Sequence, residues 1–187
     1  MEKKQSFLDP GQCCLFIVDP QERLMAHIHG ADRVITNITL MIQLAEVFSL
    51  PVLCCTQYKK GIGPIVPELA QRLTGAPCPD KLHFNALANP DVRQELDKLP
   101  REIDTLLLCG VETHICIYQT AMGALQAGYK VRCIVDGVSS RTSENDRFGR
   151  QRLCEIGVVL APAEMIIYEL LQQAGTSQFK AMLPFLK

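Results

Sequence analysis

The chain has 187 residues, of which 48% are hydrophobic and 21% are charged, and its formal net charge at pH 7 is −1. This length and composition are typical of one soluble globular domain, so we expect a single domain over residues 1–187. No basic stripe favours nucleic acid as a partner, and no apolar run approaches the roughly 20 residues that a membrane span needs. The first twelve residues lack the apolar run of a secretory signal.

The nine cysteines do not form the pattern of a disulfide framework. Their number is odd, and Cys13–Cys14 and Cys54–Cys55 are adjacent pairs inside apolar runs, where cysteine packs as a small hydrophobic residue. The absence of a C-x-x-C motif argues against a zinc knuckle or a thioredoxin site. We therefore expect buried thiols in a reducing cytoplasm.

In the first half of the chain, short apolar runs alternate with longer amphipathic stretches. The predicted elements, in order, are a strand at residues 13–18, a helix at 31–49, a strand at 51–56, a Gly- and Pro-rich loop at 58–80 around a short helix at 68–73, and a short third strand near residues 83–84. The first strand leads directly into a charged residue, Asp19.

The second half continues the alternation. The predicted elements are a helix from 90 to about 99, a strand at 105–109, a helix at 116–127 closed by Gly128, a strand at 129–135, a helix to 156, a strand at 158–160 and a helix at 162–174. Asn89 before Pro90 is a typical N-cap, and Gly110 is expected to begin a turn. Ser143 with Asp146 resembles a capping box, and Gly175 is expected to close the last helix.

Continuous apolar strands separated by helices predict a three-layer α/β/α fold, Rossmann-like, with a parallel sheet of about six strands. In such sheets ligands bind beyond the carboxyl ends of the strands, where the strand order reverses. The residues that the sequence places there are Asp19, the segment around Lys81, and the segment from Gly110 to Cys116.

Each of these residues also has an ordinary structural interpretation. Asp19 could cap a turn, Lys81 alone is typical of a solvent-exposed loop, and Cys116 could be a small residue packed beneath a helix. As a nucleophile, Cys116 would benefit from its predicted place at a helix start, where the helix dipole lowers a thiol pKa. On that interpretation Cys116 should be the first of the nine cysteines to be alkylated.

Metal and cofactor sites are not predicted. His27, His29, His83 and His114 are scattered, and no carboxylate–histidine cluster has the spacing of metal ligands. The Gly61-Ile62-Gly63 sequence lacks the strand-turn-helix context of a dinucleotide-binding loop, so we interpret it as a turn.

A strand ending in Asp-Pro-Gln, a lysine near mid-chain and the segment C-G-V-E-T-H-I-C-I-Y-Q-T-A at residues 109–121 together resemble the isochorismatase-like hydrolases. That family includes nicotinamidase and N-carbamoylsarcosine amidase. The segment T-Q-Y-K-K-G-I-G-P-I-V-P-E-L at residues 56–69 further resembles an uncharacterised, isochorismatase-domain-containing branch. The resemblance runs in family order from about residue 12 to residue 175.

This resemblance implies a catalytic triad in which Cys116 is the nucleophile, Asp19 the general base and acid, and Lys81 the supporting cation. It also implies a non-proline cis peptide between Val111 and Glu112, with the backbone N–H groups of Glu112 and Cys116 forming an oxyanion hole. Nicotinamidases bind a metal through Asp-x-His after the second strand, and this chain has Gln57-Tyr58-Lys59 there. The departure implies no metal and makes a pyridine substrate less expected.

The function predicted from these roles is hydrolysis of a small amide or related carbonyl compound through a Cys116 thioester. Gln21, Tyr58, Phe84 and Tyr118 are expected to contact the substrate, and the family resemblance implies a homo-oligomer. Two alternatives remain open. One is a family member that binds or assembles without catalysis, and the other is a thiol-redox protein, for which no resolving cysteine lies near Cys116.

Overall fold

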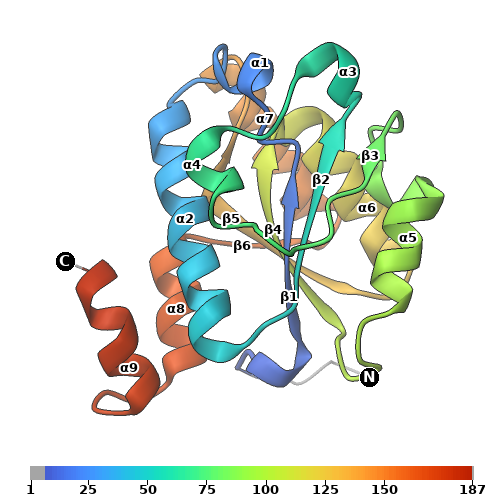
Figure 1. Ribbon diagram of the computed structural model, residues 1–187. Helices are drawn as coiled ribbons and strands as arrows, with labels where there is room; N and C mark the ends of the chain where they lie inside the picture. Colours follow the sequence, from blue (N-terminus) through green and yellow to red (C-terminus); the bar gives the residue numbers. More distant parts are fainter. Residues whose placement is uncertain (1–6, 187) are drawn as a thin grey trace.

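The computed structural model describes residues 7–186, and its centre is a sheet of six parallel strands in the order β3-β2-β1-β4-β5-β6 (Figure 1). The strands are β1 (Cys13–Val18), β2 (Val52–Gln57), β3 (Asp80–Lys81), β4 (Thr105–Val111), β5 (Lys130–Ser139) and β6 (Val159–Ala161). This confirms the predicted fold class. The expectation for the first twelve residues falls partly on residues 1–6, which lie outside the described part.

The α-helices connect the strands and cover both faces of the sheet. They are α1 (Glu22–Met25), α2 (Ala31–Phe48), α3 (Lys59–Ile62), α4 (Pro67–Ala70), α5 (Pro90–Asp97), α6 (Tyr118–Gln126), α7 (Ser143–Glu155), α8 (Ala163–Leu171) and α9 (Ser177–Met182). Short 3-10 turns lie at η1 (Pro10–Gln12), η2 (Ala86–Ala88) and η4 (Leu183–Phe185), and a π-helical turn at η3 (Thr113–Ile117). No helix among residues 7–186 is long and apolar enough to cross a membrane.

Two apolar cores lie on opposite faces of the sheet. Helices α2, α8 and α9 cover one face, while α5, α6 and α7 cover the other (Figure 1). Because successive side chains of a strand point to opposite faces, adjacent residues of β2 divide between the cores: Cys54 packs in the first and Cys55 in the second. All six residues of β1 are buried, as a central parallel strand requires.

The strand order reverses between β1 and β4, which pair in parallel from Cys13–Thr105 to Val18–Gly110. The chain continues from β1 outward through β2 and β3, and later from β4 outward in the other direction. The residues that follow β1 and β4 therefore flank the crevice where a doubly wound sheet binds its ligands. These residues include Asp19 and Cys116.

The third strand was predicted at the wrong place. It comprises Asp80 and Lys81, paired with Thr56 and Gln57, and not His83 and Phe84. The prolines before Asp80 interrupt the pattern by which a strand is predicted, although their carbonyls pair with β2. Cys54 N donates to Pro77 O, and Thr56 N donates to Pro79 O. A proline is tolerated at an edge because only its N–H is lost.

Three predicted termini also differ. Gly110 continues β4 and does not begin a turn, since it pairs with Val18 on one side and Val138 on the other. The N-cap of α7 is Thr142, whose hydroxyl accepts from Asn145 N, so the proposed Ser143–Asp146 box is wrong. Helix α8 ends before a left-handed Gln172, and not at Gly175.

The close approach of β4 to β1 generates a stability prediction. Gly110 has φ of 121°, and a Cβ atom there would lie 2.0 Å from the carbonyl oxygen of Val18. Gly128 also has positive φ, 94°, but nothing lies within 4 Å of the position of its Cβ. We expect Gly128→Ala to cost about 1–2 kcal/mol through backbone strain alone. Gly110→Ala should cost about 1–3 kcal/mol more through overlap with β1.

Urea unfolding of both variants and of wild type measures these differences. Equal losses for the two substitutions would mean that β4 does not need glycine for its contact with β1.

Candidate active site

A buried ion pair lies at the carboxyl edge of the sheet. Asp19 follows β1, Lys81 ends β3, and the Lys81 Nζ to Asp19 Oδ2 distance is 2.6 Å. Both side chains are 0% exposed, so the charges are hidden from solvent. Since β2 lies between β1 and β3, the lysine side chain spans the width of one strand to reach its partner.

Gln57, the last residue of β2, binds the Lys81 ammonium from the strand that lies between β1 and β3. Lys81 Nζ donates to Gln57 Oε1 at 2.7 Å, and Gln57 Nε2 donates to the Leu82 carbonyl at 2.9 Å. The second bond fixes which end of the amide faces the ammonium. In the sequence Gln57 marked only the departure from the nicotinamidase motif, although a polar residue at the carboxyl end of a buried strand could have indicated a place in the site.

Asp19 has partners for both carboxylate oxygens. Its backbone is left-handed, with φ of 55°, and its N–H donates to the Cys55 carbonyl. Lys81 occupies Oδ2, while the Cys55 thiol donates to Oδ1 at 3.5 Å. Cys55 was predicted only as a buried strand residue, so its contact with the carboxylate is a feature that the sequence pattern did not reveal.

Cys116 lies in η3, directly after β4, and is 6% exposed. Its thiol is close enough to Asp19 and Lys81 for both charges to act on its pKa. The structure therefore brings the three predicted triad residues into mutual interaction, although they are separated by 62 residues and then 35 in the chain (81 − 19 and 116 − 81).

The expected lowering of the Cys116 pKa is wrong. Burial, and next the Asp19 carboxylate, raise the pKa of this thiol well above its usual value, and the Lys81 ammonium opposes them only in part. Cys116 lies in a π turn of five residues, and its removal from solvent is the largest of these effects. At rest Cys116 is consequently a protonated thiol.

The two members of the ion pair respond to burial and to each other. Burial raises the pKa of the Asp19 carboxyl, against the lowering effect of Lys81. Burial alone would lower the pKa of Lys81, but the Asp19 carboxylate raises it above its usual value. A carboxylate whose pKa is raised is a better proton acceptor than an ordinary aspartate, while Lys81 keeps its charge.

Helix α7 packs against η3. The Thr113 hydroxyl donates to Asp146 Oδ1 at 2.6 Å, and Asp146 also forms an ion pair with Arg150 on the next turn of α7. A Cβ atom at Gly149 would lie 2.9 Å from the His114 backbone nitrogen, so the helix and the turn are in close contact. Asp146 was predicted to belong to the capping box of this helix, but its carboxylate instead accepts from Thr113.

The peptide bond between Val111 and Glu112 is cis, at the position that the family resemblance implied. The Glu112 carboxylate accepts from the Arg141 backbone N–H at 2.9 Å, from Nε at 3.1 Å and from Nη2 at 2.7 Å. Burial would raise the pKa of Glu112, but these hydrogen bonds outweigh burial and hold it below its usual value.

The four residues that were predicted to contact substrate lie in different environments. Gln21 is fully buried, and its amide bonds both the N–H and the carbonyl of Gln57 and the Gly63 carbonyl, so it braces the Lys81 environment. Tyr58 and Phe84 are exposed. The Tyr118 hydroxyl accepts from Arg152 on α7.

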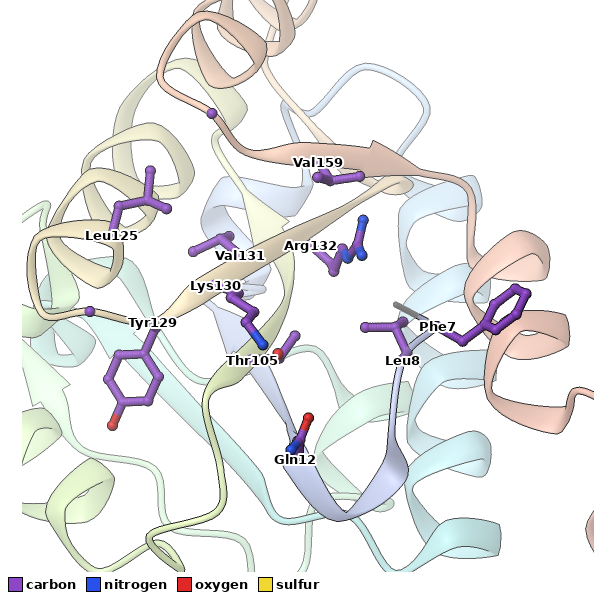
Figure 2. Close-up of a pocket in the computed structure, with 12 residues that line it drawn as sticks. Phe7, Leu8, Gln12, Thr105, Leu125, Tyr129, Lys130, Val131, Arg132 and Val159 are labelled. Atoms are coloured by element: carbon purple, nitrogen blue, oxygen red, sulfur yellow. The ribbon is translucent and has the colours of Figure 1, made fainter. Parts of the chain in front are cut away.

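Two cavities outside the triad are defined by their lining residues. One, of about 540 Å³, adjoins the Glu112–Arg141 pair and is lined also by Arg23, Leu24, His27, Ile28 and Thr142. The other, of about 410 Å³, lies at the opposite end of the sheet, where β4 and β5 begin at Thr105 and Lys130 (Figure 2). Residues 7–186 contain no group of three or more His, Cys, Asp or Glu side chains that could hold a metal ion.

The Glu112–Arg141 pair generates a pH-dependent prediction. Because the folded pKa of Glu112 lies below its unfolded value, the pair stabilises the fold above the unfolded pKa, about 4.5. This contribution is lost as the pH falls through the lower, folded pKa. Arg141→Ala should cost about 1–2 kcal/mol at neutral pH, a figure reduced for the exposure of the guanidinium.

The difference between wild type and Arg141→Ala should shrink as the pH falls below about 4. Denaturant unfolding across pH measures it, and substitution of the exposed Arg101 by alanine is the control. A cost that stays constant down to the acid limit would show that Arg141 acts through packing and not through the Glu112 charge.

Comparison with known proteins identifies the family of the chain. The family model described as "Isochorismatase domain" matches residues 13–165. The mouse isochorismatase domain-containing protein 2B is 35% identical over 178 residues, which cover 95% of this chain and 82% of that protein.

Solved structures agree on the fold. The structure titled MAR1 ribonuclease from Caenorhabditis elegans is 28% identical, with a TM-score of 0.89 and coverage of 97% of this chain and 92% of that chain. The YcaC gene product of Escherichia coli, titled an octameric hydrolase of unknown specificity, is 23% identical, with a TM-score of 0.87 and coverage of 97% and 93%. Because the family model covers residues 13–165 and the mouse relative is 35% identical over 95% of this chain, the chain belongs to the isochorismatase family.

Proposed function

We propose that this chain is a cysteine hydrolase that cleaves a small amide or related carbonyl compound through a thioester on Cys116. The observation that carries the proposal is the fully buried Lys81–Asp19 ion pair, whose carboxylate also interacts with the Cys116 thiol. A nucleophile, a base and a cation within one water-poor site are the parts that acyl transfer requires.

In the proposed mechanism the resting thiol loses its proton only when substrate is bound. Asp19, with its raised pKa, accepts the proton from Cys116 Sγ as the sulfur attacks the carbonyl carbon. The carbon–nitrogen bond then breaks, and Asp19 returns the proton to the leaving amine. Water attacks the thioester, the carbon–sulfur bond breaks, and the acid product leaves while Cys116 regains a proton.

Lys81 and two backbone groups have supporting roles in this proposal. The ammonium stays charged throughout, so it stabilises whichever of Asp19 and Cys116 is negative at each stage. The backbone N–H groups of Glu112 and Cys116 are proposed to bind the carbonyl oxygen when it becomes an oxyanion. The Glu112 side chain is occupied by Arg141, through one hydrogen bond from the backbone N–H and two from the guanidinium, so only the Glu112 backbone is assigned this role.

The proposal also covers the oligomeric state, the location and the substrate contacts of the protein. A homo-oligomer is supported by the octamer named for the Escherichia coli neighbour. The nine free cysteines are what a reducing cytoplasm maintains. Contacts from Tyr58 and Phe84 to substrate are supported by the exposure of both rings near the segment that carries Lys81. RNA is the alternative substrate, because the Caenorhabditis elegans neighbour is titled a ribonuclease.

The test is a panel of small amides and a structured RNA, each incubated with wild type, Cys116→Ala and a matched Cys154→Ser control. We expect one or more amides to be hydrolysed, with a loss of at least about 10³-fold in Cys116→Ala because the nucleophile is gone. The control should behave as wild type, since Cys154 is an exposed residue of α7.

Intact-mass spectrometry after rapid acid quench should detect an acyl adduct on wild type that is absent from Cys116→Ala. Amide hydrolysis that survives Cys116→Ala would contradict the nucleophile assignment. Cleavage of RNA alone, independent of Cys116, would replace the proposal with the ribonuclease alternative.

A further inference from the structure

Two cysteines outside the proposed triad lie opposite each other at the sheet edge. Strand β3 pairs with β2 through Thr56–Asp80 and Gln57–Lys81. Two residues earlier on each strand, the same register places Cys54 opposite Cys78. The hydrogen bonds from Cys54 N to Pro77 O and from Thr56 N to Pro79 O continue the pairing through this point.

Side chains of these opposing residues lie on one face of the sheet. Residues two apart on a strand share a face, so the Cys54–Cys78 pair lies on the same face as the Thr56–Asp80 pair. The Thr56 hydroxyl donates to Asp80 Oδ1 at 2.8 Å, which shows that opposing side chains meet here. Neighbouring strands are about 4.8 Å apart, within the roughly 4.4–6.8 Å Cα separation that a disulfide accepts.

The two thiols differ in access to solvent. Cys54 is fully buried, whereas Cys78 is exposed. An oxidant from solution would therefore meet Cys78 first, with Cys54 directly behind it. This is the arrangement of an attacking thiol and a resolving thiol.

We propose that Cys78 is a peroxide-sensitive thiol and that Cys54 converts its oxidised form into a reversible cross-strand disulfide. The Cys78 sulfur attacks hydrogen peroxide, an S–O bond forms, the O–O bond breaks and water leaves. The Cys54 sulfur then attacks the sulfenic acid, an S–S bond forms, the S–O bond breaks and a second water leaves. Two thiols lose two electrons in total, and one peroxide is reduced to two waters.

Electrostatics agree with these roles. The neighbouring Cys54 thiol lowers the pKa of the Cys78 thiol, and the nearby Lys59 ammonium acts in the same direction, against the effect of burial. The interaction with Cys78, together with burial, raises the pKa of Cys54. The exposed thiol is the one that ionises more readily, as the attacking sulfur should.

The disulfide would constrain the segment next to the Lys81–Asp19 ion pair. Pro77 and Pro79 cannot donate N–H groups, so this edge of the sheet has few hydrogen bonds. A covalent link there would tie the segment that leads to Lys81 onto β2, the strand that carries Cys55 and Gln57. The redox site is independent of the hydrolase proposal, because neither Cys54 nor Cys78 takes part in that mechanism.

The experiment exposes reduced protein to a small molar excess of hydrogen peroxide, removes peroxide with catalase, blocks free thiols and maps the peptides. We expect a linked peptide that joins Cys54 to Cys78, reversed by dithiothreitol. It should form at least about tenfold faster than Cys154, the other exposed cysteine of residues 7–186, is oxidised, because the pKa of the Cys78 thiol is lowered and its sulfenic acid meets Cys54.

Variants separate the two roles. Cys78→Ser should form no link, and Cys154→Ser should form it at the wild-type rate. In Cys54→Ala the Cys78 sulfenic acid should persist and be captured by dimedone. The proposal is overturned if the linked peptide does not form in wild type, if Cys78 is oxidised no faster than Cys154, or if Cys54→Ala yields no dimedone adduct at Cys78.

Discussion

The buried ion pair between Lys81 and Asp19 is the constraint on which the rest of the site depends. Moving two charges out of water costs several kcal/mol per ion, and only close geometry with further hydrogen bonds compensates for it. The structure meets this requirement with a 2.6 Å contact, with Gln57 on the ammonium and with Cys55 on the carboxylate. The pair is therefore compatible with folding only if β1, β2 and β3 keep their register.

The elements around Cys116 are closely packed as well. Gly110 lets β4 approach β1, which brings the segment after β4 close to Asp19. Helix α7 then holds η3 through Thr113 and Asp146. In this account the nine cysteines lie in distinct environments: Cys116 is a buried thiol whose pKa is raised by burial and then by the Asp19 carboxylate, whereas Cys78 is exposed and has Cys54 across the strand.

Sequence patterns predicted the sheet and the residues at its carboxyl edge, because buried parallel strands are continuous apolar runs and ligand sites follow their ends. They could not place β3, whose two residues follow prolines and show no apolar run. Nor could they predict the direction of the Cys116 pKa, since that depends on how much solvent the fold removes. The roles of Cys55 and Gln57 depend on contacts between strands, which spacing along one chain does not contain.

The most direct test of this account is a titration of Cys116 by NMR in protein labelled with ¹³C at the cysteine Cβ, because the Cβ shift reports thiol or thiolate. The account predicts that Cys116 is still a thiol at pH 9.0, the usual pKa of the group. Asp19→Asn should lower its pKa by removing a neighbouring negative charge, and Lys81→Met should raise it further. A Cys116 thiolate at neutral pH, or a pKa unchanged by Asp19→Asn, would contradict the claim that the Lys81–Asp19 pair controls the proton on Cys116.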